Sequence, residues 1–185
     1  MSDDLFPVFD DFLESSKHWH KFEFREEIDN ISSSDLSTEM KLVLEYLVLF
    51  QWVEYEAKQL LWFLYGATSA VRSNIYMNDG KKKDIFKLNT QPLIKELSFF
   101  SIDEDGYRKA IIEIAKSLEK LSKKRNKIAH NLFSEKLDDK SSLVKELEVD
   151  LAELKRLETT IQKLSVPINS IAAEVEIAGK RNNNG

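Results

Sequence analysis

The chain has 185 residues, of which 42% are hydrophobic and 32% are charged, a balance typical of a single soluble globular domain. The absence of cysteine excludes a disulfide framework and a thiolate metal site, and the five glycines form no phosphate loop of the kind that nucleotide-triphosphate enzymes use. The formal net charge is −5, whereas a protein that coats RNA usually has a broad basic surface. A nucleic-acid site in this chain would therefore have to be a local patch of positive charge.

The first half of the chain predicts helices joined by a serine-rich loop. Residues 5–29 predict an aromatic-rich helix or two, and the loop at 32–35 offers N-cap residues for the next element. Residues 37–65 predict a helix that is apolar on nearly all sides, as at the centre of a bundle or in an oligomer. Its charged residues interrupt it too often for a membrane span, and Gly66 is a suitable residue to end it.

Shorter elements follow in the middle of the chain. Residues 78–90 predict a turn and polar loop, and residues 91–100 predict a short helix with Pro92 in its first turn. The acids at 103–105 suit the start of the next helix, because a helix N-terminus favours negative charge. Residues 135–142 are polar and predict a loop after that helix.

The C-terminal part predicts a long amphipathic helix. Its apolar positions are Leu147, Leu151, Leu154, Leu157, Ile161 and Leu164. Pro167 should end or kink it near Val166, leaving a short final helix at 168–178. The sequence therefore predicts an all-α fold: a small helical bundle of about five helices, in one domain over residues 1–178, with a disordered tail at 179–185.

One face of the helix before position 132 carries an unexpected arginine. The positions that recur at alternating steps of four and three are Tyr107, Ile111, Ile114, Leu118, Leu121, Arg125, Ile128 and Leu132. A guanidinium on an otherwise apolar face is costly unless it meets a carboxylate, an anion or a wet pocket. Two interpretations stay open: Arg125 pairs with a buried acid such as Glu54 or Glu56, or it binds a phosphate.

His130 follows Arg125 by five positions and adds a group that transfers protons near neutral pH. This Arg-x4-His motif, within the string from Leu118 to Asn131, resembles the HEPN superfamily, and the similar context covers roughly residues 36–135. The resemblance implies a metal-independent endoribonuclease without a cofactor, in which a homodimer brings two motifs into one cleft. Such proteins are often toxins or anti-phage defence effectors, so an antitoxin or a defence-system partner is a further expectation.

By the same resemblance, Arg125 would hold the scissile phosphate, His130 would serve in acid–base catalysis, and Asn126 would be the polar position after the arginine. Positions five apart on an ideal helix are separated by about 140°, so Arg125 and His130 do not share a face, whereas Asn126 and His130 do. A second subunit or an irregular helix would bring the groups together. The alternative function is a catalytically silent HEPN-like module that binds RNA, a nucleotide or a partner protein.

Lysines surround the motif and form a local cationic cluster. The candidate RNA-binding residues are Lys120, Lys123, Lys124 and Lys127. The alternative is that they decorate a solvated helix face near its C-terminal end. No metal site is expected, because His18 and His20 are two positions apart and would face different sides of a helix. The acidic N-terminus lacks signal-peptide features, so we expect a cytoplasmic protein. We expect it to bind RNA and not a membrane.

Overall fold

The computed structural model describes residues 26–69, 85–100, 107–132 and 140–183, and these ranges contain helices and no strand. A helical segment at 26–33 precedes the main elements. These are α2 (Thr38–Ser69), the 3₁₀ helix η1 (Ile85–Lys87), α4 (Thr90–Phe99), α5 (Tyr107–Leu132) and α6 (Lys140–Asn183). The prediction of an all-α helical bundle is confirmed. The aromatic-rich region at 5–25 lies outside the described residues.

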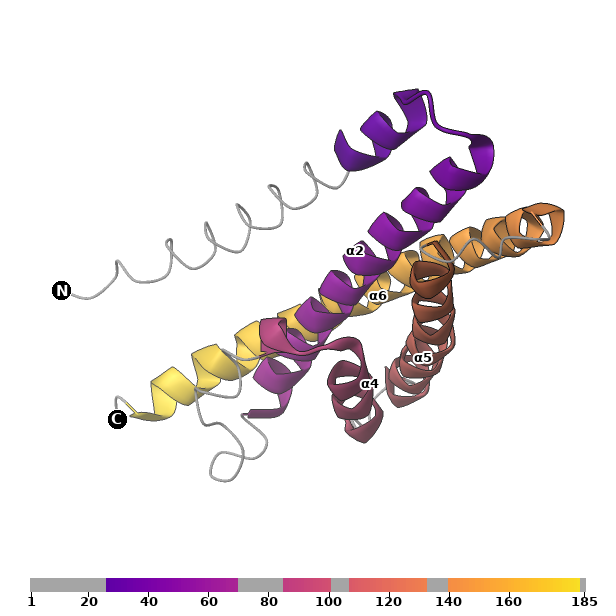
Figure 1. The fold of residues 1–185 in the computed structure, drawn as a ribbon. Coiled ribbons are helices and arrows are strands. Elements are labelled where there is room, and N and C mark those ends of the chain that lie inside the picture. Colours follow the sequence, from indigo (N-terminus) through magenta and orange to yellow (C-terminus); the bar gives the residue numbers. More distant parts are fainter. Residues whose placement is uncertain (1–25, 70–84, 101–106, 133–139, 184–185) are drawn as a thin grey trace.

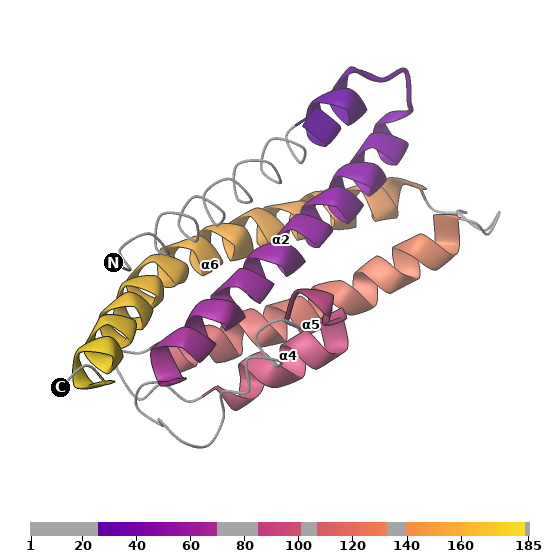
Figure 2. The ribbon, with the colours of Figure 1, turned by 90° about the vertical axis from the view of Figure 1, so that its left-hand side faces the viewer.

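Helix α2 is the centre of the bundle. It packs along α6 on one side, and α4 and α5 lie on the other (Figures 1 and 2). Its buried side chains surround much of its circumference and include Val43, Tyr46, Leu49, Phe50, Trp52, Val53, Ala57, Leu60, Leu61, Phe63 and Leu64. The central position predicted for this helix is therefore confirmed, because a helix without a polar face has to be covered on several sides.

The start of α2 is fixed by a serine cap. The preceding helical segment runs through Ser33, so it includes the first part of the loop predicted at 32–35. Ser37 accepts a hydrogen bond at its Oγ from the backbone N–H of Met40, at 3.3 Å. This is the bond that an N-cap serine makes to the third residue of its helix, so Ser37 is the cap.

The sequence predicted that α2 ends at Gly66, but the helix continues to Ser69. A Cβ atom at Gly66 would lie only 3.1 Å from the Cβ of Ala172 in α6. The glycine therefore allows α2 and α6 to approach closely, and this packing decides its place in the helix interior.

Helix α6 is longer than predicted at both ends. It begins at Lys140, inside the predicted loop at 135–142. Pro167 was expected to end or kink the helix near Val166, and the helix does not end there but continues through the proline. Ile168 is fully buried and continues the apolar face beyond the proline. A proline within a helix costs about 3 kcal/mol, and burial of the helix on both sides of it offsets that cost. The backbone is helical up to Asn183, where a disordered tail from 179 was predicted.

The apolar faces of α5 and α6 are covered within one chain. On α5, the predicted positions Ile111, Ile114, Leu118, Leu121 and Ile128 are all buried. On α6, the predicted positions are also buried, with exposed fractions between 0% and 8%. The bundle itself thus covers the apolar face of α6.

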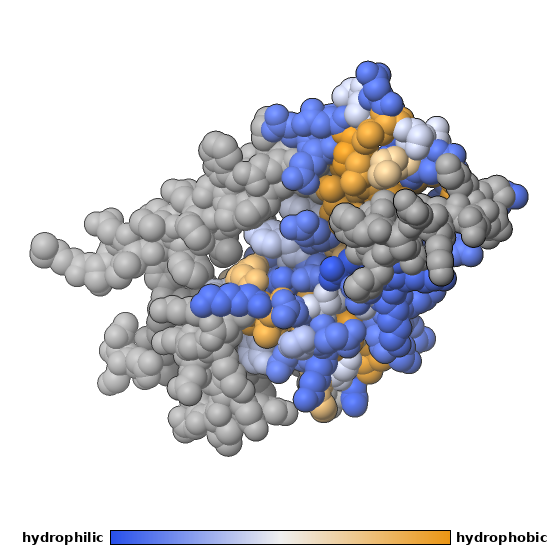
Figure 3. Space-filling view, in the orientation of Figure 1, coloured by the Kyte–Doolittle hydropathy of each residue, from blue (hydrophilic) through white to orange (hydrophobic). Residues whose placement is uncertain are grey.

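The surface of the described residues is mixed. Seen as in Figure 3, the face over α5 is mostly hydrophilic, and apolar side chains gather between the segment 26–33 and the first turns of α2. Leu36, between the segment 26–33 and α2, and Met40, in the first turn of α2, are 43% and 37% exposed. Among the described helices, none is both long and apolar enough to span a bilayer.

Helix α4 confirms the short helix predicted at 91–100, since it spans Thr90–Phe99 with Pro92 in its first turn. Asn89 is its N-cap residue. The region predicted as a polar loop at 78–90 contains η1 in its described part, and Ile85 of η1 is buried.

Candidate functional site

The Arg-x4-His motif lies in the last turns of α5, on one continuous helix that ends at Leu132. A continuous helix keeps positions 125 and 130 about 140° apart around its axis. Asn126 and Lys127 are exposed, whereas Arg125 is only partly exposed. His130 belongs to the helical backbone, and its side chain lies outside what the structure describes.

Arg125 turns toward the interior of the bundle. Its guanidinium carbon lies 5.3 Å from the centre of the Phe50 ring of α2, within the range of a cation–π interaction. Its Nη2 donates to the Thr90 hydroxyl at the start of α4, at 3.4 Å. Its Nε is buried and has no hydrogen-bond partner within the described ranges.

Thr90 connects this arginine to a carboxylate of α2. The Thr90 hydroxyl donates to Oε2 of Glu54 at 2.6 Å, and Oε1 of Glu54 lies 2.9 Å from the Lys58 ammonium. Glu54 was one of the two acids considered as partners for Arg125. It is reached only through Thr90, and the described residues contain no ion pair between Arg125 and a carboxylate.

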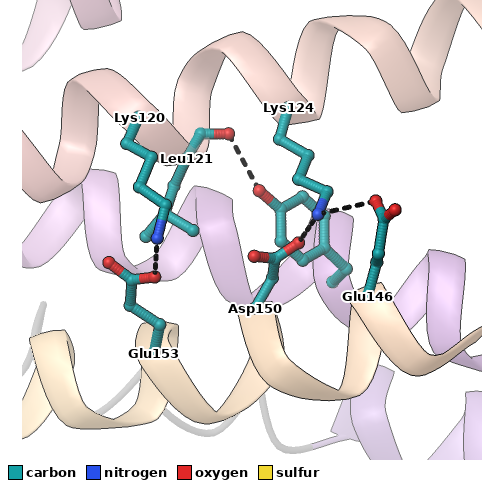
Figure 4. A network of polar contacts seen from close by, with 7 residues as sticks. Lys120, Leu121, Lys124, Glu146, Asp150 and Glu153 are labelled. Atoms are coloured by element: carbon teal, nitrogen blue, oxygen red, sulfur yellow. Dashed lines mark hydrogen bonds and ion pairs between the residues drawn. The ribbon is translucent and has the colours of Figure 1, made fainter. Parts of the chain in front are cut away.

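Three of the four candidate RNA-binding lysines are paired with acids of the same chain, and Figure 4 shows two of them, Lys120 and Lys124. Lys120 contacts Glu153 at 2.6 Å, and Lys123 contacts Glu119 at 2.7 Å. The side chains of these two lysines are 65% and 70% exposed, and such surface pairs contribute only about 0–1 kcal/mol. Lys127 is exposed.

Lys124 differs from its neighbours because it joins α5 to α6 at a buried carboxylate. Its ammonium lies 2.5 Å from Asp150, whose side chain is 5% exposed, and 3.1 Å from Glu146 (Figure 4). Burial alone would lower the pKa of Lys124, but the hydrogen bonds and charges of Asp150 and Glu146 outweigh it and raise the pKa above its usual range. Lys124 is thus a structural residue of the helix interface.

Tyr46 completes this buried polar group. Its hydroxyl donates to the backbone carbonyl of Leu121 at 2.8 Å, one turn before Arg125 on α5. Burial raises the pKa of Tyr46 well above its usual range, and the charge of Asp150 adds to this, while Arg125 acts in the opposite direction. Together, Tyr46 and Lys124 connect α5 to α2 and α6 within one turn of Arg125.

Several residues of this region, among them Phe50, Thr90 and Asp150, were not singled out from the sequence. No sequence pattern points to Phe50 or Thr90, because their contacts with Arg125 depend on which helices cross. A pattern does point to Asp150: it interrupts the buried face of α6 between Leu147 and Leu151, just as Arg125 interrupts the face of α5. Both residues are polar members of apolar seams, and both lie where α5 faces its neighbours.

The described part of the site supplies positive charge and hydrogen-bond donors. No group of three or more metal-ligating side chains occurs within residues 26–69, 85–100, 107–132 and 140–183. No family model, curated protein or solved structure matches this chain. The chemistry of the site has therefore to be argued from its own residues.

Proposed function

We propose that this protein is a metal-independent endoribonuclease of the HEPN type, acting as a toxin or an anti-phage defence effector. One observation carries the proposal: Arg125 is partly buried on the inner face of α5, its Nε is buried without a partner, and no described carboxylate forms an ion pair with it. A guanidinium inside a bundle ordinarily meets an acid, because an unpaired buried charge is costly. A phosphate group would supply the missing negative charge, and arginine is well shaped to bind it.

The proposed reaction is an internal transesterification of RNA. The ribose 2′-oxygen attacks the adjacent phosphorus and loses its proton, while the bond from phosphorus to the 5′-oxygen breaks and that oxygen gains a proton. His130 would move one of these protons, and Arg125 would stabilise the negative charge that develops on the phosphoryl oxygens. The products are a 2′,3′-cyclic phosphate and a 5′-hydroxyl.

The proposed assembly is a homodimer through the motif-bearing end of α5. The reason is geometric, because one continuous helix separates positions 125 and 130 by about 140°. A second copy of the motif would bring an arginine and a histidine to the same phosphate. Lys127 is the exposed lysine next to this end of α5 that no described acid pairs with, and we propose that it contacts the RNA backbone.

A second candidate function is a HEPN-like module that binds RNA, a nucleotide or a partner protein without cleaving it. The orientation of Arg125 favours it, since the guanidinium packs on Phe50 and donates to Thr90 inside the bundle. The pairing of Lys120, Lys123 and Lys124 with acids also reduces the positive charge that the motif surface offers.

Incubation of the purified full chain with a mixed RNA pool in EDTA separates the two functions. We expect cleavage that persists in the chelator and leaves 2′,3′-cyclic phosphate ends, because no step of the reaction uses a metal. RNA that stays intact, or cleavage that EDTA stops, would remove the metal-free nuclease. Binding of intact RNA would then favour the module.

Asn126 provides a finer test, because it shares a helix face with position 130 through their four-residue spacing. We expect Asn126→Ala to lower the cleavage rate about tenfold or more with little change in RNA binding, since an orienting group acts mainly in the transition state. Its stability should change by no more than about 0.5 kcal/mol, because Asn126 is exposed. Asn169→Ala, at an exposed asparagine of α6, is the matched control. Equal rates for both variants would contradict a role for Asn126.

A further inference from the structure

Thr90 is a buried hydroxyl that stands between the motif arginine and an acid of the central helix. Thr90 is 7% exposed. Its oxygen accepts from Nη2 of Arg125 at 3.4 Å and donates to Glu54 at 2.6 Å. The three residues come from α5, α4 and α2, so this one hydroxyl links the guanidinium to two other helices of the bundle.

We propose that Thr90, supported by Glu54, is a positioning residue that holds the Arg125 guanidinium in its direction without neutralising its charge. The proposal rests on the nuclease function proposed above and extends it to two residues outside the Arg-x4-His motif. Thr90 does not touch the RNA in this proposal. It acts through Arg125.

A hydroxyl suits this role better than a direct carboxylate. A carboxylate takes two parallel hydrogen bonds from a guanidinium, and a phosphate would have to displace it before binding. The Thr90 hydroxyl accepts one hydrogen bond, so it leaves most of the five N–H donors of Arg125 uncommitted. The Phe50 ring, 5.3 Å from the guanidinium carbon, supports the same orientation from a second side.

Glu54 fixes the direction in which the Thr90 hydroxyl points. The hydrogen bond from Thr90 to Glu54 is short, at 2.6 Å, as expected when the acceptor is charged. The single proton of the hydroxyl is committed to this bond, so its lone pairs remain for Arg125. Lys58, at 2.9 Å, holds the other oxygen of Glu54. The order of donation therefore runs from Arg125 to Thr90 to Glu54.

Steady-state cleavage of RNA by three variants tests the kinetic consequence. Thr90→Val removes the hydroxyl and keeps the shape, and we expect kcat to fall between about tenfold and a hundredfold while KM changes less than about twofold. Thr90→Ser restores the hydroxyl and should recover most of the rate. Thr159→Val, at an exposed threonine of α6, is the control and should match the wild type. An unchanged kcat for Thr90→Val, or a serine variant as slow as the valine variant, would overturn the proposal.

A measurement without RNA separates this proposal from the nuclease assignment. The Nε–Hε NMR signal of Arg125, identified by its loss in Arg125→Lys, should move toward that of a free arginine in Thr90→Val and stay in place in Thr90→Ser. A signal that does not move would show that Thr90 does not position the Arg125 guanidinium, whether or not RNA is cleaved. A signal that moves, in a protein that cleaves no RNA in EDTA, supports this positioning and rejects the nuclease.

Glu54→Gln keeps the test informative if Thr90→Val does not fold. The amide keeps the size of Glu54 and removes its charge, so the Thr90 hydroxyl is no longer oriented by a carboxylate. We expect kcat to fall and the Arg125 signal to move in the same directions as in Thr90→Val, by smaller amounts. A variant that folds and matches the wild type in both measurements would contradict the role of Glu54.

Discussion

Replacing either Arg125 or His130 with alanine should reduce RNA cleavage at least about a hundredfold, because each removes a group that acts in the transition state. Both variants should remain helical, since neither change removes one of the apolar residues buried on α5 and α6. The measurement is the initial rate of cleavage of a labelled RNA in EDTA, with circular dichroism as the check on folding.

Matched controls distinguish catalysis from a general loss of positive charge. Arg156→Ala removes an exposed arginine from α6, and Lys116→Ala removes an exposed lysine from α5. Both should cleave RNA at close to the wild-type rate. Arg125→Lys keeps the charge but loses the planar fork of donors, so it should remain strongly impaired. Activity that survives in both Arg125→Ala and His130→Ala would place the chemistry elsewhere.

Hydrophobic periodicity predicted most of the fold. The apolar seam of α5 and the long stripe of α6 are buried as the spacing indicated, because a helix face with that many apolar residues has to be covered. Helix α4 was predicted to within one residue at each end. Local signals for helix ends failed where packing between helices was stronger, as at Gly66 against Ala172 and at Pro167 within the buried stripe.

The candidate site was predictable only in part. The seam of α5 correctly placed Arg125 on the inner face, but the partner of Arg125 could not be read from spacing. Thr90 lies 35 positions earlier in the chain, and its contact depends on how α4 crosses α5. The lysines illustrate the same limit: they form one run in the sequence, yet Lys123 pairs on the surface of α5 while Lys124 reaches Asp150 of α6.

That difference between neighbouring lysines leads to a large expected effect on stability. Lys124→Ala should lower the free energy of unfolding by about 3 kcal/mol, because it leaves the buried carboxylate of Asp150 without its cation. For a chain of this size, the loss corresponds to a decrease in Tm of about 6–12 °C. Lys123→Ala is the matched control, and its surface pair predicts a change within about 0.5 kcal/mol.

The double variant Lys124→Met, Asp150→Leu shows whether the effect comes from an uncompensated charge. Replacing both partners of a buried pair by apolar residues is often neutral or stabilising, so the double variant should regain most of the stability that Lys124→Ala loses. Equal losses in the single and double variants would instead assign the effect to side-chain packing.

The pH dependence of unfolding gives an independent check with a definite sign. In the folded protein, burial lowers the pKa of Lys124, but the hydrogen bonds to Asp150 and Glu146 outweigh burial. The pKa of Lys124 is therefore raised. Its contribution to stability is therefore fully present below the ordinary lysine pKa of 10.5 and is lost as the pH rises through the higher folded value. Denaturant unfolding from neutral pH to well above the ordinary lysine pKa of 10.5 should show the stability gap between wild type and Lys124→Ala narrow only at the alkaline end. A gap that closes near neutral pH would mean that another group, and not the Lys124 ammonium, carries the stabilisation.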